Sequence, residues 1–311
     1  MNKSELKSLI KGTLAVTPTP FDDNYQLDLG KTRDITQWWI EQGLGTTNSP
    51  LKITAGGGEC HNLSEDEWLQ VLKTTVDAAG TGAIIMCGLK SKSTIHTIED
   101  AKKAQDVGII GLQIELPFYH HPIQDDYVRY FTDISDSIDI GIMIYNTHFY
   151  SAPSIKAETM LRLTDAEHVV AIKWNTPPNE DFNEMTKFSN EFNVINNGGD
   201  MIQFHKNGGK GTQSSIAAAC PKYALDLWNL VEAKEYEKAK MELEKDKILN
   251  NWRKKSALIS GGNRHNKAYM AAVGKYVGQP RLPTLPVEEH EINELRETFK
   301  SFGWITDQNQ I

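Results

Sequence analysis

The sequence predicts an α/β protein, a (β/α)8 or TIM barrel followed by a C-terminal helical extension. Short apolar or β-branched runs alternate with longer amphipathic stretches, and the runs recur about every 25 to 35 residues. This period is that of one strand with its crossover helix, which parallel strands require. Eight such repeats fit within residues 12–222. Periodicity alone also permits an open, doubly wound sheet.

Each expected strand is a short apolar run, and each expected helix has apolar residues at helical spacing. The strands are expected at residues 13–17, 52–55, 83–87, 109–115, 140–145, 169–173, 192–195 and 211–214. Helices between them are expected at residues 65–79, 94–106, 125–137 and 157–163. After the eighth repeat, helices are expected at residues 224–251, 266–274 and 287–302. Residues 1–222 are therefore expected to form the barrel, and residues 223–311 helices packed on it.

The composition argues against several classes of protein. The formal net charge is −8, and no dense block of Lys and Arg indicates a nucleic-acid partner. No apolar run approaches the roughly 18 residues of a membrane span, and the polar N-terminus lacks a signal-peptide core. The three cysteines match no CxxC or zinc pattern, and we expect them to be reduced thiols. We therefore expect a cytoplasmic protein with no membrane or nucleic-acid partner and no metal.

Two polar residues stand at the ends of expected strands, where a (β/α)8 barrel carries its catalytic groups. Tyr145 closes the run Gly-Ile-Met-Ile-Tyr, and Lys173 closes Val-Val-Ala-Ile-Lys. Apolar surroundings would disfavour the ammonium form of Lys173, and a neutral amine can attack a ketone to form an imine. Tyr145 could then move protons. The alternatives are a solvated lysine at a strand end and a tyrosine that only packs.

Three glycines follow the second expected strand, in the run Thr54-Ala-Gly-Gly-Gly-Glu59. Successive N–H groups of such a run can form a nest for a carboxylate. The run lacks the spacing of a dinucleotide loop or of a phosphate loop. A tight turn with no ligand is the alternative.

An ordered set of motifs resembles the dihydrodipicolinate synthase/N-acetylneuraminate lyase family over nearly the whole chain. The motifs are Gly12-Thr-Leu-Ala-Val-Thr-Pro-Thr-Pro-Phe21, Ala55-Gly-Gly-Gly-Glu59, Leu116-Pro-Phe-Tyr-His-His-Pro122, Tyr145-Asn146, Ala171-Ile-Lys173, Asn207-Gly-Gly-Lys-Gly-Thr-Gln-Ser214 and Pro280-Arg-Leu-Pro283. The ordered set is more specific than any one motif.

The resemblance implies a role for each matching position. Lys173 would form the imine with pyruvate or another 2-oxo acid, and Tyr145 would act as proton shuttle. The backbone of Gly56 and Gly57 would hold the substrate carboxylate, and Tyr119 would reach into a neighbouring subunit's site. Ser214, at the end of the eighth strand, is expected on the substrate side. The resemblance further implies a homotetramer, as a dimer of dimers, and no organic cofactor.

Three departures from the family pattern indicate a changed substrate. Gly56 and Gly57 stand where the family has two hydroxyl residues, and Tyr150 stands where the synthases have an arginine. The backbone nest survives, but the hydroxyl that relays protons to the tyrosine does not. Tyr150 and Trp174 are expected to line a wider, more aromatic pocket. Packing under loops or at a subunit interface is their alternative role.

The expected function is that of a Schiff-base-forming lyase, either an aldolase or a dehydratase. Its substrate would be a 2-oxo acid, such as pyruvate or a 2-keto-3-deoxy sugar acid, bound as an imine on Lys173. One alternative is dihydrodipicolinate synthase proper, which the missing hydroxyls and arginine disfavour. The other is a ligand-binding protein without catalysis, which the presence of both Tyr145 and Lys173 disfavours.

Overall fold

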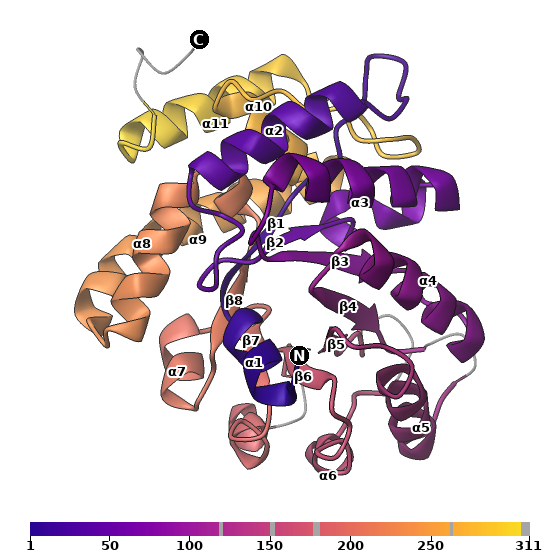
Figure 1. Cartoon of the computed structure of the whole chain (residues 1–311). Coiled ribbons are helices and arrows are strands. Elements are labelled where there is room, and N and C mark those ends of the chain that lie inside the picture. Colours follow the sequence, from indigo (N-terminus) through magenta and orange to yellow (C-terminus); the bar gives the residue numbers. More distant parts are fainter. Residues whose placement is uncertain (118–120, 150–152, 177–180, 262–263, 306–311) are drawn as a thin grey trace. The chain divides into compact units, whose positions relative to one another are not determined.

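Eight parallel strands form a closed barrel in the order of the chain (Figure 1). The computed structural model describes residues 1–117, 121–149, 153–176, 181–261 and 264–305. The strands are β1 (Gly12–Val16), β2 (Leu51–Ile53), β3 (Ile85–Leu89), β4 (Gly111–Glu115), β5 (Gly141–Tyr145), β6 (Val169–Trp174), β7 (Asn193–Asn196) and β8 (Gly211–Ser214). All eight predicted strands are present in order, which confirms the barrel and excludes the doubly wound sheet.

The helices alternate with the strands and then continue beyond β8. They are α1 (Lys3–Leu9), α2 (Leu29–Glu41), α3 (Glu65–Ala79), α4 (Thr94–Val107), α5 (Gln124–Ser135), α6 (Ala157–Leu161), α7 (Met201–Lys206), α8 (Pro221–Glu232), α9 (Tyr236–Ile259), α10 (Arg264–Ala272) and α11 (Glu289–Ser301). The C-terminal helical extension was predicted from the sequence. In the described residues no helix is long and apolar enough to cross a membrane.

The chain divides into two compact units. The first contains residues 1–14, 46–52 and 82–213, with α1, α4 to α7 and strands β3 to β7. The second contains residues 15–45, 53–81 and 214–311, with α2, α3 and α8 to α11. Strands β1, β2 and β8 begin in the first unit and end in the second. The predicted boundary between residues 222 and 223 stays a prediction.

Helix α1, which the sequence did not predict, closes the core of the first unit. Asn2 caps it in a capping box with Glu5. Leu6 and the following Ile10 are fully buried and pack with Leu14, Met86, Met143, Ala171 and Ile195 from the strands. A Cβ at Gly111 or Gly141 would lie 2.7 or 2.4 Å from the Cδ1 of Ile10. Glycine therefore starts β4 and β5 because Ile10 occupies that space.

The helix expected at residues 224–251 is wrong as a single element, because α8 and α9 are separate. Lys234 has φ of 61°, and this left-handed residue ends α8. The N–H groups of Lys234 and Glu235 bond to the carbonyls of Val231 and Leu230, which closes the helix end. Glycine usually fills such a position, so a lysine there left no signal in the sequence.

A buried arginine joins the C-terminal helices of the second unit. Arg264 donates to both carboxylate oxygens of Glu291 at 2.6 and 3.1 Å and to the Oγ of Ser256 at 2.7 Å. It also donates to the carbonyls of Leu285 and Pro286. This single side chain therefore ties α9, α10, α11 and the segment before α11 together, with a charge-assisted pair at its centre.

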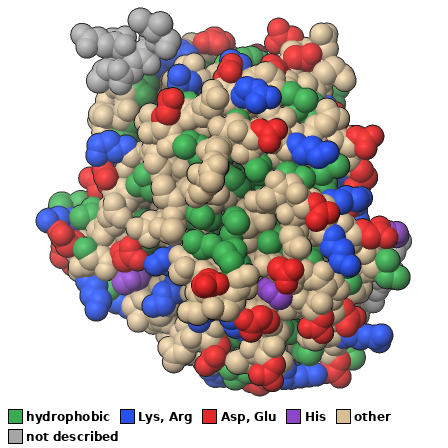
Figure 2. Space-filling model, viewed as in Figure 1, with side chains coloured by type: hydrophobic (Ala, Val, Ile, Leu, Met, Phe, Trp, Pro, Cys, Tyr) green, Lys and Arg blue, Asp and Glu red, His purple; other side chains and the backbone are tan. Residues whose placement is uncertain are grey.

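The surface agrees with the acidic composition. On the face shown in Figure 2, acidic and basic side chains are interspersed, and no basic field gathers over any element. In the described part of the chain, no group of three or more His, Cys, Asp or Glu side chains could hold a metal ion.

Candidate active site

Residues at the C-terminal ends of three neighbouring strands form the centre of the candidate site. Glu115 of β4 pairs in register with Tyr145 of β5, and Tyr145 pairs with Lys173 of β6. Partners in a parallel ladder share one face, so the three side chains leave their strands on the same side. The structure therefore brings together Tyr145 and Lys173, as predicted, and adds Glu115.

Lys173 is held as a reactive amine. Its residue is only 7% exposed, and its Nζ lies 3.6 Å from the centroid of the Tyr145 ring. Burial lowers the pKa of Lys173 to about 7, while the carboxylate of Glu115 acts in the opposite direction. Among the described residues, no hydrogen-bond acceptor holds this Nζ. About half of the lysine is thus neutral near pH 7, with its lone pair available for attack on a carbonyl.

Asn146, which follows Tyr145, holds the loop after β5 in place through its hydrogen bonds. Its backbone N–H donates to the carbonyl of Lys173 at 3.2 Å, which joins the ends of β5 and β6. Its side-chain oxygen accepts from the N–H of Ile155 at 3.2 Å, and its Nδ2 donates to the Oγ of Ser154 at 3.1 Å. This buried side chain fixes both ends of the loop after Tyr145. The ring of Phe149, in the same loop, packs 5.9 Å from that of Tyr145.

A layer of polar side chains crosses the barrel interior at the level of Gln113, two residues before Glu115 in β4. Lys52 of β2 is fully buried, and its Nζ donates to the side-chain oxygens of Gln113 of β4, at 2.6 Å, and of Gln213 of β8. The Nε2 of Gln213 donates to the carbonyl of Leu14 at 2.8 Å. The interior of a barrel is normally filled by branched apolar side chains. Here a buried lysine is solvated by two amides, so the lumen tolerates charge.

Sequence analysis missed Lys52, Gln113 and Glu115. The signal was present, because strands buried on both faces usually read as continuous apolar runs. The run Leu112-Gln-Ile-Glu115 instead alternates, and Lys52 interrupts Leu51-Lys-Ile53. Polar residues at alternate positions of such a strand indicate a polar barrel interior.

The glycine loop lies in the second unit as a 3-10 turn over Gly56–Gly58. A Cβ at Gly57 would lie 2.3 Å from Val16 Cγ1 and 2.9 Å from Asn266 Nδ2, whereas nothing lies within 4 Å of a Cβ at Gly56. Asn266 also donates to the carbonyl of Gly57 at 2.8 Å. Glycine is therefore required by packing at position 57 but not at position 56. Just before the loop, Thr54 has φ of 45°, a strained value for a β-branched residue.

Glu59 and Arg281 hold the end of this loop in place. Glu59, with φ of 60°, accepts at Oε2 from the N–H of Arg281 at 2.9 Å and from Asn62 Nδ2 at 3.1 Å. Arg281 in turn pairs through both terminal nitrogens with Glu67, whose pKa falls to about 2 mainly because of this hydrogen bonding. The arginine of the Pro280–Pro283 motif therefore has a structural role.

Of the remaining predicted positions, Trp174 and Ser214 lie within the described residues. Trp174 is buried, packs 5.3 Å from the Phe188 ring and donates to Thr176 Oγ1 at 3.2 Å. These contacts support the packing alternative for Trp174. The Oγ of Ser214 accepts from the N–H of Ala217 at 3.2 Å, which supports the turn after β8. Tyr119 and Tyr150 lie outside the described residues.

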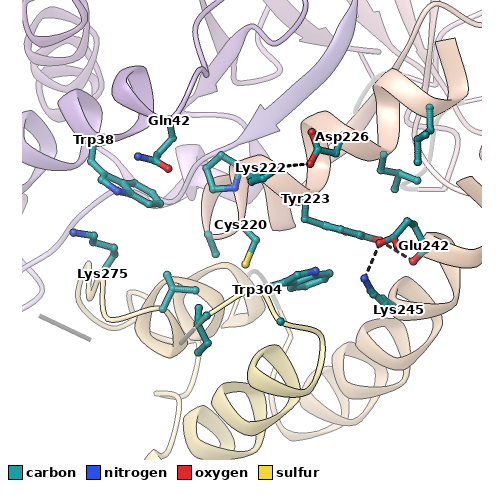
Figure 3. A pocket seen from close by; sticks show the side chains of 17 residues that line it. Trp38, Gln42, Cys220, Lys222, Tyr223, Asp226, Glu242, Lys245, Lys275 and Trp304 are labelled. Atoms are coloured by element: carbon teal, nitrogen blue, oxygen red, sulfur yellow. Dashed lines mark hydrogen bonds and ion pairs between the residues drawn. The ribbon is translucent and has the colours of Figure 1, made fainter. Parts of the chain in front are cut away.

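A cavity of about 740 Å³ lies elsewhere, within the second unit (Figure 3). The Tyr223 and Trp304 rings pack there with centroids 4.1 Å apart, and the carboxylates of Asp226 and Glu242 pair with Lys222 and Lys245. Burial raises the pKa of Cys220 far above its usual range, so its thiol is not a nucleophile. None of the described residues predicted for catalysis or substrate binding lines this cavity, and its charged groups already have partners.

A buried, partly neutral lysine beside a tyrosine at the ends of barrel strands defines the class of (β/α)8 lyases that form a Schiff base. The model of the dihydrodipicolinate synthetase family matches residues 9–302. The chain therefore belongs to this family, which confirms the predicted resemblance and the family-level function of a Schiff-base lyase.

The relatives agree over their full lengths. The 4-hydroxy-tetrahydrodipicolinate synthase of Geobacter metallireducens is 29% identical over 300 residues, covering 96% of this chain and 100% of the relative. A solved dihydrodipicolinate synthase from Bacillus anthracis has a TM-score of 0.80 at 26% identity, over 94% of this chain and 99% of its own. A prophage protein of the same family from E. coli K12, solved in complex with pyruvate, has a TM-score of 0.82 at 19% identity and shares the fold, over 96% of this chain and 100% of its own.

Proposed function

We propose that this lyase cleaves or dehydrates a 2-oxo acid, such as pyruvate or a 2-keto-3-deoxy sugar acid, through an imine on Lys173. The observation that carries the proposal is the state of Lys173. A buried lysine with a pKa of about 7 and no described hydrogen-bond acceptor is suited to nucleophilic attack and poorly suited to a structural role. Tyr145 serves as the proton shuttle beside it.

The substrate is proposed to differ from that of the synthases, although the curated relatives carry that name. Gly56, Gly57 and Tyr150 stand where the synthases have two hydroxyls and an arginine. The packing around Gly57 leaves no space for a hydroxyl side chain without movement of Val16. Holding of the substrate carboxylate by the backbone of Gly56 and Gly57 remains part of the proposal, as do contacts from Tyr119, Tyr150 and Ser214.

Borohydride reduction in the presence of a panel of 2-oxo acids tests the proposal. Pyruvate and 2-keto-3-deoxy sugar acids should leave a reduced adduct on Lys173, located by mass spectrometry of its peptide. The same panel, followed for pyruvate release against loss of water, separates aldol cleavage from dehydration. Absence of any adduct across the panel would refute the lyase proposal and favour a ligand-binding protein. Condensation of pyruvate with the aldehyde that the synthases use would instead restore the synthase alternative.

The expected assembly and location belong to the same proposal. A homotetramer, built as a dimer of dimers in the cytoplasm, is expected from the family resemblance. Sedimentation equilibrium on the 34.9 kDa chain should give about four times that mass. A monomer would remove the expectation that Tyr119 completes a neighbouring subunit's site.

A further inference from the structure

We propose that the carboxylate of Glu115 is the counter-ion of Lys173 and stores its proton while the imine forms. This inference rests on the proposed function, because it assigns a second group to the same reaction. It answers a question that the sequence leaves open. Gly56 and Gly57 carry no hydroxyl that could relay protons to Tyr145, so another group must hold and return them.

The strand geometry places the side chain of Glu115 on the face of β4 that points into the barrel lumen. Gln113, two residues earlier in β4, reaches Lys52 of β2 and therefore points into the lumen. Because side chains two apart in a strand share a face, Glu115 points into the lumen as well. Its register partner is Tyr145, and the next strand across carries Lys173. Strands are spaced about 4.8 Å apart, so the side chains of Glu115 and Lys173 can span the two strand spacings between them.

Burial makes this carboxylate effective. Glu115 is 3% exposed and Lys173 is 7% exposed, so water screens their interaction weakly. The field of Glu115 acts on Lys173 and favours its charged form. An imine is also cationic once protonated. The same carboxylate therefore stabilises the cation before the reaction, as ammonium, and after it, as iminium.

The step balances without a co-reactant. The ammonium of Lys173 gives one proton to the carboxylate of Glu115, and the resulting amine attacks C2 of the 2-oxo acid to form the C–N bond. The carbonyl electron pair moves to oxygen, and Tyr145 transfers one proton from nitrogen to that oxygen. Glu115 then returns its proton to the hydroxyl, the C–O bond breaks, water leaves, and the nitrogen lone pair forms the C=N bond. Ammonium and ketone have become iminium and water, with Glu115 again ionised.

Two variants of equal size, Glu115→Asp and Glu115→Asn, separate the effect of charge from that of packing, because only the first keeps a carboxylate. A third variant, Glu115→Gln, removes the charge and keeps the length of the glutamate side chain. With pyruvate as the probe, the rate of borohydride-trapped adduct on Lys173 is measured per folded molecule, with the folded fraction taken from circular dichroism. We expect Glu115→Asn and Glu115→Gln to slow adduct formation by about 10²- to 10⁴-fold, the range of a lost acid–base group. Glu115→Asp should recover at least a tenth of the wild-type rate.

The control is another buried carboxylate of the first unit. Asp100 is 5% exposed and pairs with Lys92 at 2.6 Å, and Asp100→Asn should change stability but not the rate per folded molecule. Equal rates for wild type, Glu115→Asn and Glu115→Gln would overturn the role of Glu115 while leaving the imine intact. A slow Glu115→Asp, equal to Glu115→Asn, would also overturn it, because shape and not charge would then matter. Failure of the proposed function looks different, since wild type itself would form no adduct.

Discussion

Lys173 and Lys267 are both buried lysines whose pKa burial lowers to about 7, yet their surroundings are opposite. The Nζ of Lys267 donates to the carbonyl of Val277 at 2.8 Å and to that of Thr19, and it lies 3.9 Å from a Glu59 oxygen. Both amines lie over an aromatic ring, that of Phe21 for Lys267 and that of Tyr145 for Lys173, but among the described residues no hydrogen-bond acceptor holds the Nζ of Lys173. A lowered pKa therefore does not identify the catalytic lysine. The difference lies in whether the protons and lone pair of the amine are already committed.

Replacement of Lys173 gives the largest expected effect. Lys173→Met should lower turnover by about 10⁴-fold or more, because no imine can form. The unfolded lysine keeps its proton up to pH 10.5, whereas the folded one releases it near 7. Protonation therefore favours the unfolded state below pH 10.5, fully so below 7. Removing the amine should raise the free energy of unfolding at pH 7 by about 1–4 kcal/mol.

Activity assays and urea titrations on the same preparation measure both effects. If Lys173 is catalytic, its replacement should both abolish turnover and raise the free energy of unfolding. A stable variant that retains its turnover would show that Lys173 is not the nucleophile. A variant that loses several kcal/mol would show that Lys173 is structural, like Lys267.

Lys267→Met should have the reverse outcome. It would leave the buried carbonyls of Thr19 and Val277 and the carboxylate of Glu59 without their cation, at a cost of about 3–5 kcal/mol. Urea unfolding at pH 7 measures this loss. Lys173 should still form an adduct in the molecules that remain folded. If Lys267→Met is as stable as wild type, the hydrogen bonds of Lys267 make no net contribution to the free energy of unfolding. The proposed difference between the two lysines would then be wrong.

The sequence predicted Tyr145 and Lys173 because a single rule places catalytic groups at strand ends. It did not predict Glu115 or Lys52, although the polar residues in their strands indicated a polar barrel interior. Which strands face one another across the lumen is a property of the folded barrel, so the partners of these polar residues could not be read from the sequence. The break between α8 and α9 was missed for a related reason, since Lys234 adopts a glycine conformation without being glycine.

The two glycines of the loop provide an intermediate effect and sharpen the distinction between packing and chemistry. Gly57→Ser should cost about 1–3 kcal/mol, because its Cβ would lie 2.3 Å from Val16. Gly56→Ser should change stability by less than about 0.5 kcal/mol, because its Cβ meets open space. Thermal unfolding of the matched pair measures both. Equal losses would mean that the loop moves freely, and that a hydroxyl at position 57 is absent for reasons other than space.

The smallest expected effect is a pH dependence, and it tests which lysine sets the reactivity. The amine of Lys173 loses its proton as pH rises through about 7. The proposed step begins when that proton passes to Glu115, so the rate of adduct formation should fall above pH 7, by about fivefold between pH 7 and pH 8. Because Glu115 holds this pKa up, Glu115→Gln should move the limb to lower pH, whereas Lys267→Met should leave it in place. Among the described residues, Tyr145 of β5 and Glu115 of β4 are the titratable groups in register with Lys173. A limb that stays near pH 10 in the wild type would show that Lys173 is solvated, and its burial would then carry no chemistry.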